Sequence, residues 1–193
     1  MLGKNLFIIG TMNTADKSID SIDYAIRRRF IFIDSPADRN VVKNCYQSIS
    51  GKTDEESIEL FLFDAVQALF DNELFFNDEY QKSDVKLGHT YFLRKNASNY
   101  ADDMIEKFVF QIIPILREYV KDGILDTIEN LIDSEYSIDD IGRAGTREEK
   151  IEMVSANMMM FIKEFGNSTK AGTEINNEYV CNFVNNLITA LGY

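Results

Sequence analysis

Two short apolar runs near the N-terminus place the strongest constraint on the fold. Residues 6–9 are apolar and stop at a polar turn that begins with Gly10, and residues 30–33 form a second apolar run. Short apolar runs bounded by turn residues are typical of buried strands. Between them we expect a short helix, from about Asp20 to the three consecutive arginines at 27–29. Strand, polar turn, helix and strand make up a βαβ unit, so the sequence predicts a small parallel β element.

The polar turn after the first run is a candidate binding site, because ligands of open α/β sheets bind at the carboxyl ends of the strands. Asn13, Thr14 and Asp16 lie in this turn. The amide of Asn13 carries both hydrogen-bond donors and an acceptor, so it can orient an attacking water and contact a phosphate at the same time. Asparagine also ends strands because it tolerates turn geometry. For Asp16 a binding role and a structural role, as a local turn acceptor or a charge partner of the helix, explain the residue equally well.

The three arginines end the short helix, where cations complement the helix dipole. That effect alone could account for them. However, each residue of a helix turns the side chain by about 100°, so three adjacent side chains cannot share one face. At least one guanidinium must therefore point away from the solvated side. Arg27 and Arg28 are the candidates for contacts to another molecule.

From residue 37 onward the pattern predicts helices almost throughout. A capping box at 53–56 introduces a long amphipathic helix, and a second one at 146–149 introduces another. A third long helix is expected from about Asn99, kinked at Pro114 and broken at Gly123. The apolar stripe of the first of these helices consists of Ile58, Phe61, Leu62, Ala65, Val66, Leu69 and Phe70.

The histidine, the two cysteines and a methionine run are further candidates for functional sites. His89 is the only histidine, and a lone histidine between apolar neighbours is more often structural than functional. Cys45 and Cys181 lie far apart without metal-ligand spacing, which favours reduced thiols in a cytoplasmic protein. The methionine run at 158–160 is expected to pack within a helix. We therefore expect no metal site, and no segment is long enough to span a membrane.

Four stretches resemble the AAA+ ATPase superfamily, and within it most closely the McrB-type GTPases of modified-cytosine restriction systems. Two of them lie beside the arginines: Met-Asn-Thr-Ala-Asp-Lys-Ser at 12–18 and Asp-Tyr-Ala-Ile-Arg-Arg-Arg-Phe at 23–30. Two more are Leu-Gly-His-Thr-Tyr-Phe at 87–92 and Ile-Pro-Ile-Leu-Arg-Glu-Tyr at 113–119. The likeness covers roughly residues 5–122 and fades beyond.

The resemblance implies a mostly α-helical chain with a small parallel β element. Residues 1–36 would be the C-terminal end of an AAA+ nucleotide-binding core, residues 37–133 a helical lid, and residues 134–193 a helical C-terminal extension. It further implies that Asn13 acts as a sensor, that Arg27 and Arg28 reach a neighbouring subunit's nucleotide, and that Thr14, Asp16 and His89 contact nucleotide. An arginine finger of this kind stabilises the transferring phosphoryl group, an effect on the order of 10³-fold or more.

The phosphate-binding elements of the family are missing from the 193 residues. No Gly-x-x-x-x-Gly-Lys-Ser/Thr loop (Walker A) occurs, and no strand ahead of residue 6 ends in paired acidic residues (Walker B). We therefore expect the C-terminal portion of an NTPase that is inactive alone, with GTP or ATP and Mg²⁺ bound only in the complete protein. The alternative is a non-enzymatic interaction or regulatory module that assembles with complete AAA+ subunits.

The formal net charge of −12 argues against direct nucleic-acid binding, since phosphate contacts need a basic footprint. Residues 1–43 hold seven Lys and Arg against five Asp and Glu, so the basic character concentrates near the arginines. The expected partners are other AAA+ subunits in a ring and an McrC-like endonuclease, with DNA contacted only indirectly. The two N-terminal strands would lack the phosphate-loop strand between them and would pair with each other or with a second copy.

Overall fold

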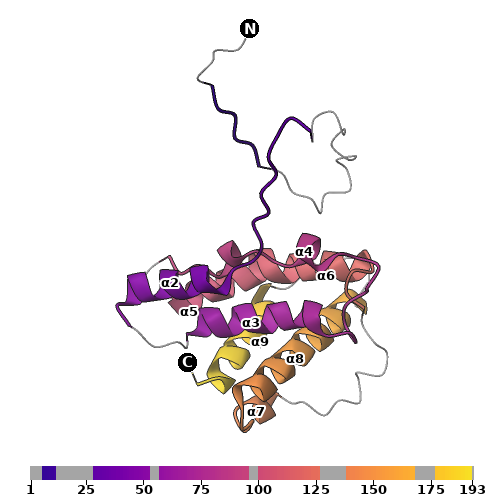
Figure 1. The fold of residues 1–193 in the computed structure, drawn as a ribbon. Helices are drawn as coiled ribbons and strands as arrows, with labels where there is room; N and C mark the ends of the chain where they lie inside the picture. The colour runs from indigo at the N-terminus through magenta and orange to yellow at the C-terminus, as the bar shows by residue number, and fades with distance from the viewer. Residues whose placement is uncertain are drawn as a thin grey trace.

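The computed structural model describes residues 6–11, 28–52, 57–95, 100–126, 138–167 and 177–192. Its helices form one packed body, and an extended arm projects from it (Figure 1). We use "arm" for residues 6–11 and 28–36, which contain no helix and lie outside the body. Residues 28–37 lead directly into the first helix of the body. The arm therefore connects the predicted site region to everything that follows.

The predicted strands at 6–10 and 30–33 are not formed as paired strands. Both segments run as extended chain, and the described residues contain only an isolated antiparallel bridge, between Phe76 and Leu125. Of the two expected pairings, direct pairing of the segments with each other is therefore not seen among the described residues. Apolar sequence favours a strand, but the hydrogen bonds of a strand must come from a neighbour in the right register. Pairing with a second copy stays a prediction.

Helix α3, Ile58–Asp71, lies at the centre of the body and packs against α2, Arg39–Ser50, as well as other helices. All seven residues of its predicted apolar stripe are buried, and so are Leu60 and Phe63 on other sides of the helix. The helix begins later than predicted: its N-cap is Ser57, whose Oγ accepts from the backbone N–H of Leu60 at 3.3 Å. The predicted capping box at 53–56 lies outside the described residues.

A short helix α4, Lys82–Val85, and a 3₁₀ turn η1, His89–Phe92, follow α3. The next long helix is continuous but not uniform, running through α5 Tyr100–Lys107, a π-helical turn η2 Phe108–Ile112, and α6 Ile113–Lys121. The N–H of Ile113 bonds to the carbonyl of Phe108, five residues back. Pro114 has no N–H to continue the α pattern, so the expected irregularity takes the form of this π turn.

Gly123 ends this long helix as predicted. Its φ of 71° lies in the left-handed region that glycine adopts without steric cost. The N–H of Ile124 then turns back to the carbonyl of Tyr119 at 2.8 Å, which satisfies one of the last carbonyls of the helix.

The C-terminal helices are α7 Ile138–Ile141, α8 Arg147–Asn167 and α9 Asn177–Ala190. The capping box predicted at the start of α8 is confirmed. Thr146 Oγ1 accepts from the N–H of Glu149 at 3.1 Å, and Glu149 Oε2 accepts from the N–H of Thr146 at 3.1 Å. Met158 and Met159 are buried in the helix interface, as expected for packing residues.

A single hydrophobic core runs through the body and joins residues on both sides of position 133. Helix α8 packs on α3, where Ser155 Oγ donates to the carbonyl of Ala65 at 2.8 Å. Phe161 of α8 and Phe183 of α9 stack with their ring centroids 4.1 Å apart. The C-terminal helices therefore share their core with the helices before them. None of the helices in the described ranges has the length and apolar character that a bilayer span requires.

Candidate functional site

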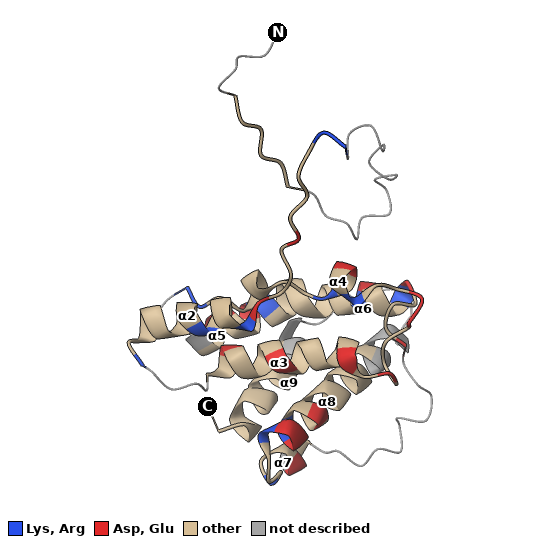
Figure 2. Ribbon diagram, viewed as in Figure 1, with Lys and Arg blue, Asp and Glu red and all other residues tan. Residues whose placement is uncertain are grey.

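The predicted site residues divide into two groups. Asn13, Thr14, Asp16 and Arg27 lie outside the described residues. Arg28 and His89 lie within them, and the structure does not bring these two side chains together. Arg28 is on the arm, in a turn and exposed, with the basic residues of that turn visible in Figure 2 away from the helical body. An exposed guanidinium offers five N–H donors to another molecule.

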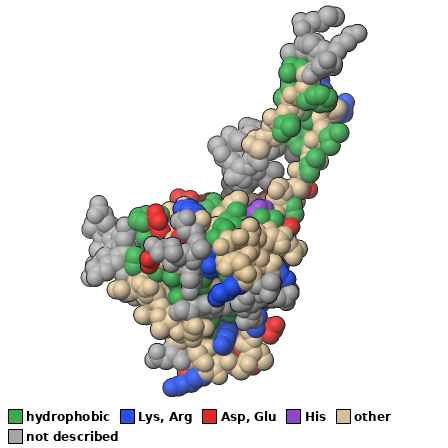
Figure 3. All heavy atoms as spheres, turned by 90° about the vertical axis from the view of Figure 1, so that its left-hand side faces the viewer, with side chains coloured by type: hydrophobic (Ala, Val, Ile, Leu, Met, Phe, Trp, Pro, Cys, Tyr) green, Lys and Arg blue, Asp and Glu red, His purple; other side chains and the backbone are tan. Residues whose placement is uncertain are grey.

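His89 lies in the body where the arm joins it, and its ring is visible in Figure 3 at this junction. The side chain is half-buried, and Nδ1 accepts a hydrogen bond from the backbone N–H of Asp38 at 3.2 Å. Because Nδ1 is the acceptor, the neutral imidazole carries its proton on Nε2. His89 therefore has a structural role at the foot of the arm and retains one donor for a further contact.

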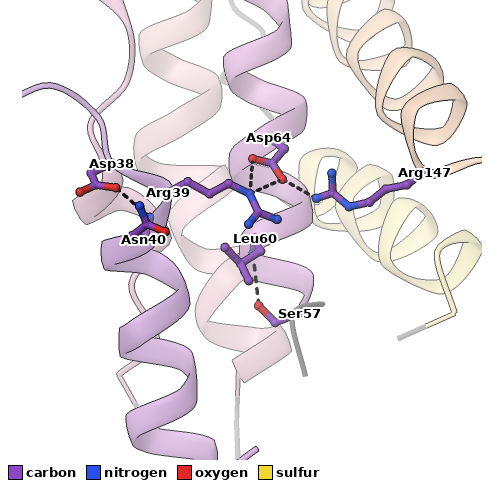
Figure 4. Close-up of polar contacts among 7 residues, drawn as sticks. All are labelled: Asp38, Arg39, Asn40, Ser57, Leu60, Asp64 and Arg147. Carbon is purple, nitrogen blue, oxygen red and sulfur yellow. Dashed lines mark hydrogen bonds and ion pairs between the residues drawn. The ribbon is translucent and has the colours of Figure 1, made fainter. Parts of the chain in front are cut away.

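The residues that begin α2 form the second half of this junction. Asp38 is the N-cap, and its Oδ1 accepts from the N–H of Asn40 at 2.8 Å (Figure 4). The next residue, Arg39, donates from Nε to both carboxylate oxygens of Asp64, at 3.0 and 2.9 Å. Arg147 also donates to Asp64 Oδ2. One carboxylate on α3 thus holds the first residue of α2 and the first residue of α8.

A buried ion pair lies deeper in the body and fixes the segment that follows η1. Arg94 Nε and Glu59 Oε1 are 2.6 Å apart, and both side chains are almost fully buried. The guanidinium also lies over the ring of Tyr46, 4.9 Å from its centroid. Lys107 donates from Nζ to the carbonyl of Leu93. Such contacts to charged groups are stronger than those between neutral groups, so the chain after His89 is firmly held.

Sequence reasoning did not find Arg39, Asp64 and Arg147. Asp64 carried a signal, because an acidic residue in the middle of a mostly apolar helix needs a partner when that helix is buried. The identity of the partners could not be read from the sequence, since Arg147 lies 83 residues away. Glu59 carried the same signal and pairs with Arg94, 35 residues away.

The side chains at the junction can bind and position other groups. Within the described ranges, no three or more His, Cys, Asp or Glu side chains are arranged to hold a metal ion. Cys45 and Cys181 are free thiols and half-buried. The arm adds exposed apolar side chains, which Figure 3 shows gathered away from the body. The junction therefore offers the Nε2–H donor of His89, while the exposed guanidinium of Arg28 and the exposed apolar side chains lie farther out on the arm.

Comparison with known proteins gives a partial likeness. The chain is 36% identical over 134 residues to the type IV methyl-directed restriction enzyme EcoKMcrB subunit of Escherichia coli (strain K12). Part of this chain is therefore similar in sequence to part of that subunit. The alignment covers 62% of this chain and 26% of the McrB subunit, so the chain spans about a quarter of its relative's length. No protein-family model matches the chain, and no solved structure matches it.

Proposed function

We propose that this chain is the C-terminal portion of an McrB-like AAA+ NTPase subunit. Complete subunits of this kind form a ring that hydrolyses GTP or ATP with Mg²⁺ and drives an McrC-like endonuclease on modified DNA. The observation that carries the proposal is the partial identity to a restriction-enzyme McrB subunit. The junction supports it, because an arginine-bearing arm enters a helical body next to His89.

In this proposal Arg27 and Arg28 stabilise charge on the phosphoryl group of a neighbour's nucleotide. Asn13 orients the attacking water, and Thr14 and Asp16 line the same turn. His89 contacts nucleotide through Nε2–H, the donor that the Asp38 contact leaves available. A non-enzymatic role, in which the chain joins rings of complete subunits without hydrolysing nucleotide, is the second candidate. It is favoured by the exposed apolar arm, which is suited to pairing with another chain.

The test begins with purified chain 1–193, which we expect to hydrolyse neither GTP nor ATP, because it has no phosphate-binding loop. Turnover that Asn13→Ala abolishes would contradict this expectation. The DNA upstream of the codon for Met1 then separates the two candidates. An in-frame phosphate-binding loop there supports the NTPase portion, whereas a separate promoter preceded by a stop codon supports the non-enzymatic module.

A further inference from the structure

The foot of the arm, Asp38 and Arg39, is held by side chains from two distant parts of the chain. His89 accepts from the backbone N–H of Asp38 at 3.2 Å. Asp64 accepts from Arg39 Nε at 2.9 Å and shares its carboxylate with Arg147 of α8. The C-terminal helices therefore reach the foot of the arm through a single intervening side chain (Figure 4).

The Asp64 contact differs from an ordinary surface ion pair. The carboxylate is 16% exposed, and the side chain of Arg147 is 29% exposed and also lies over the ring of Phe61, 5.6 Å from its centroid. By contrast, Arg143 pairs with Asp140 at 3.3 Å while remaining 81% exposed. Partial burial reduces screening by water, so the Asp64 contacts are stronger than those of the exposed pair.

Arg147 is also placed by a rigid support. It is the first residue of a 21-residue helix whose start is fixed by the capping box of Thr146 and Glu149. Ser155 ties the same helix to the carbonyl of Ala65, one residue after Asp64. The guanidinium of Arg147 therefore approaches Asp64 from a fixed direction, and Asp64 in turn sets the position of Arg39.

We propose that the C-terminal helices, residues 138–192, orient the arginine-bearing arm, and that Arg147 is the positioning residue that does so through Asp64 and Arg39. Loss of the Arg147 contact leaves Asp64 free to follow Arg39, so the first turn of α2 and the arm before it become less ordered. The consequence for hydrolysis depends on the proposed function, since Arg28 lies on this arm. The mechanical claim does not depend on it.

The experiment measures order at the foot of the arm in the full chain 1–193. Amide hydrogen exchange is followed at Asp38 and Asn40, whose N–H groups donate to His89 and to the Asp38 side chain. The ring nitrogens of His89, the only histidine, give a second NMR readout of the same junction. Arg147→Ala is compared with Arg143→Ala, which removes a more exposed pair, and with Ser155→Ala, which removes a different contact between α8 and α3.

Arg147→Ala is expected to speed exchange at both amides about tenfold and to shift the His89 ring signals, while amides inside α8 stay protected. Arg143→Ala and Ser155→Ala are expected to leave the junction unchanged. The proposal is overturned if Arg147→Ala leaves both amides as they are, or if Ser155→Ala loosens them equally, since undocking of α8 would then be the cause. Should Arg147→Ala not fold, Arg147→Lys is judged by the same criteria, with a smaller rise expected because lysine lacks the planar fork. None of these readouts requires nucleotide hydrolysis.

Discussion

The backbone N–H of Asp38 and Nδ1 of His89 lie 3.2 Å apart, joining the start of α2 to the η1 turn 51 residues later. This contact gives His89 a structural role. The sequence identified this histidine as a candidate site residue but did not show its hydrogen-bond partner. It also places the histidine where the arm meets the body. Any effect of His89 on nucleotide chemistry must therefore be separated from its effect on this junction.

Replacement of His89 by phenylalanine is expected to lower the free energy of unfolding by about 1 kcal/mol, because the Asp38 N–H loses its acceptor while ring packing is largely kept. Urea denaturation of the chain measures this change. Thr90→Ala, at the exposed neighbouring position, is the control and should change stability by less than about 0.5 kcal/mol. Equal stability of His89→Phe and the unaltered chain would show that the contact contributes nothing.

The stability of the protein should depend strongly on keeping both partners of the buried pair Glu59 and Arg94. Arg94→Met leaves a buried carboxylate unpaired and is expected to cost about 3 kcal/mol or more. The double variant Glu59→Leu with Arg94→Met removes both charges and should be more stable than Arg94→Met alone. Thermal and urea unfolding give the comparison, with Asp140→Ala in the exposed pair as the control, expected to cost less than about 1 kcal/mol. A double variant less stable than Arg94→Met would contradict the argument.

Stability should decline at alkaline pH partly through Tyr119. Burial raises the pKa of Tyr119 above its usual 10.0, and the charges of Tyr91 and Glu118 raise it further. Because the folded state holds this proton more tightly than the unfolded state, the stabilisation is fully present below pH 10 and is lost as pH rises through the folded pKa. Tyr119→Phe keeps the edge-to-face contact with Phe70 and should flatten this part of the stability profile. Parallel profiles for the two proteins above pH 10 would refute the assignment.

The arm should drive association of the isolated chain. Exposure alternates along both segments: Phe7 and Ile9 are 88% and 94% exposed against 55% for Leu6, and Ile31 is 90% exposed against 47% for Phe30. Alternation of this kind is typical of chain ready to pair as a strand, and unpaired edges are templates for association.

Light scattering is expected to detect a dimer or larger species of chain 1–193, reduced by Ile9→Lys combined with Ile31→Lys. Leu74→Lys, which alters an exposed apolar side chain of the body, is the matched control and should leave association unchanged. A chain that remains monomeric at every concentration tested would count against pairing through the arm.

Within a complete subunit of the kind proposed above, Arg27 and Arg28 are expected to act in trans. Alanine at either position should leave nucleotide affinity nearly intact while lowering turnover by about 10³-fold. Mixing that variant with a subunit defective in its phosphate loop should recover part of the activity, because each supplies what the other lacks. Intact rings without recovery in the mixture would argue that the arginines act within their own subunit.

The sequence by itself determined those features that arise from neighbours in the chain. The apolar stripe of α3 predicted its buried face, since residues three and four apart share one side of a helix. The capping box of α8 was readable because Thr146 and Glu149 are three residues apart. Pro114 indicated where the long helix becomes irregular, because proline has no backbone N–H, and Gly123 indicated where it ends, because glycine adopts positive φ.

Only the tertiary structure decided the features that depend on partners far along the chain. The two apolar runs read as strands, yet strand hydrogen bonds must come from a second segment, and none of the described residues supplies it. Asp64 and Glu59 are acidic residues in a buried helix, so the sequence indicates that each has a cationic partner. The identity of those partners depends on how the helices pack. The role of His89 likewise depends on its contact with Asp38. The sequence shows which hydrogen bonds a side chain can make, but only the fold brings a partner within hydrogen-bonding distance.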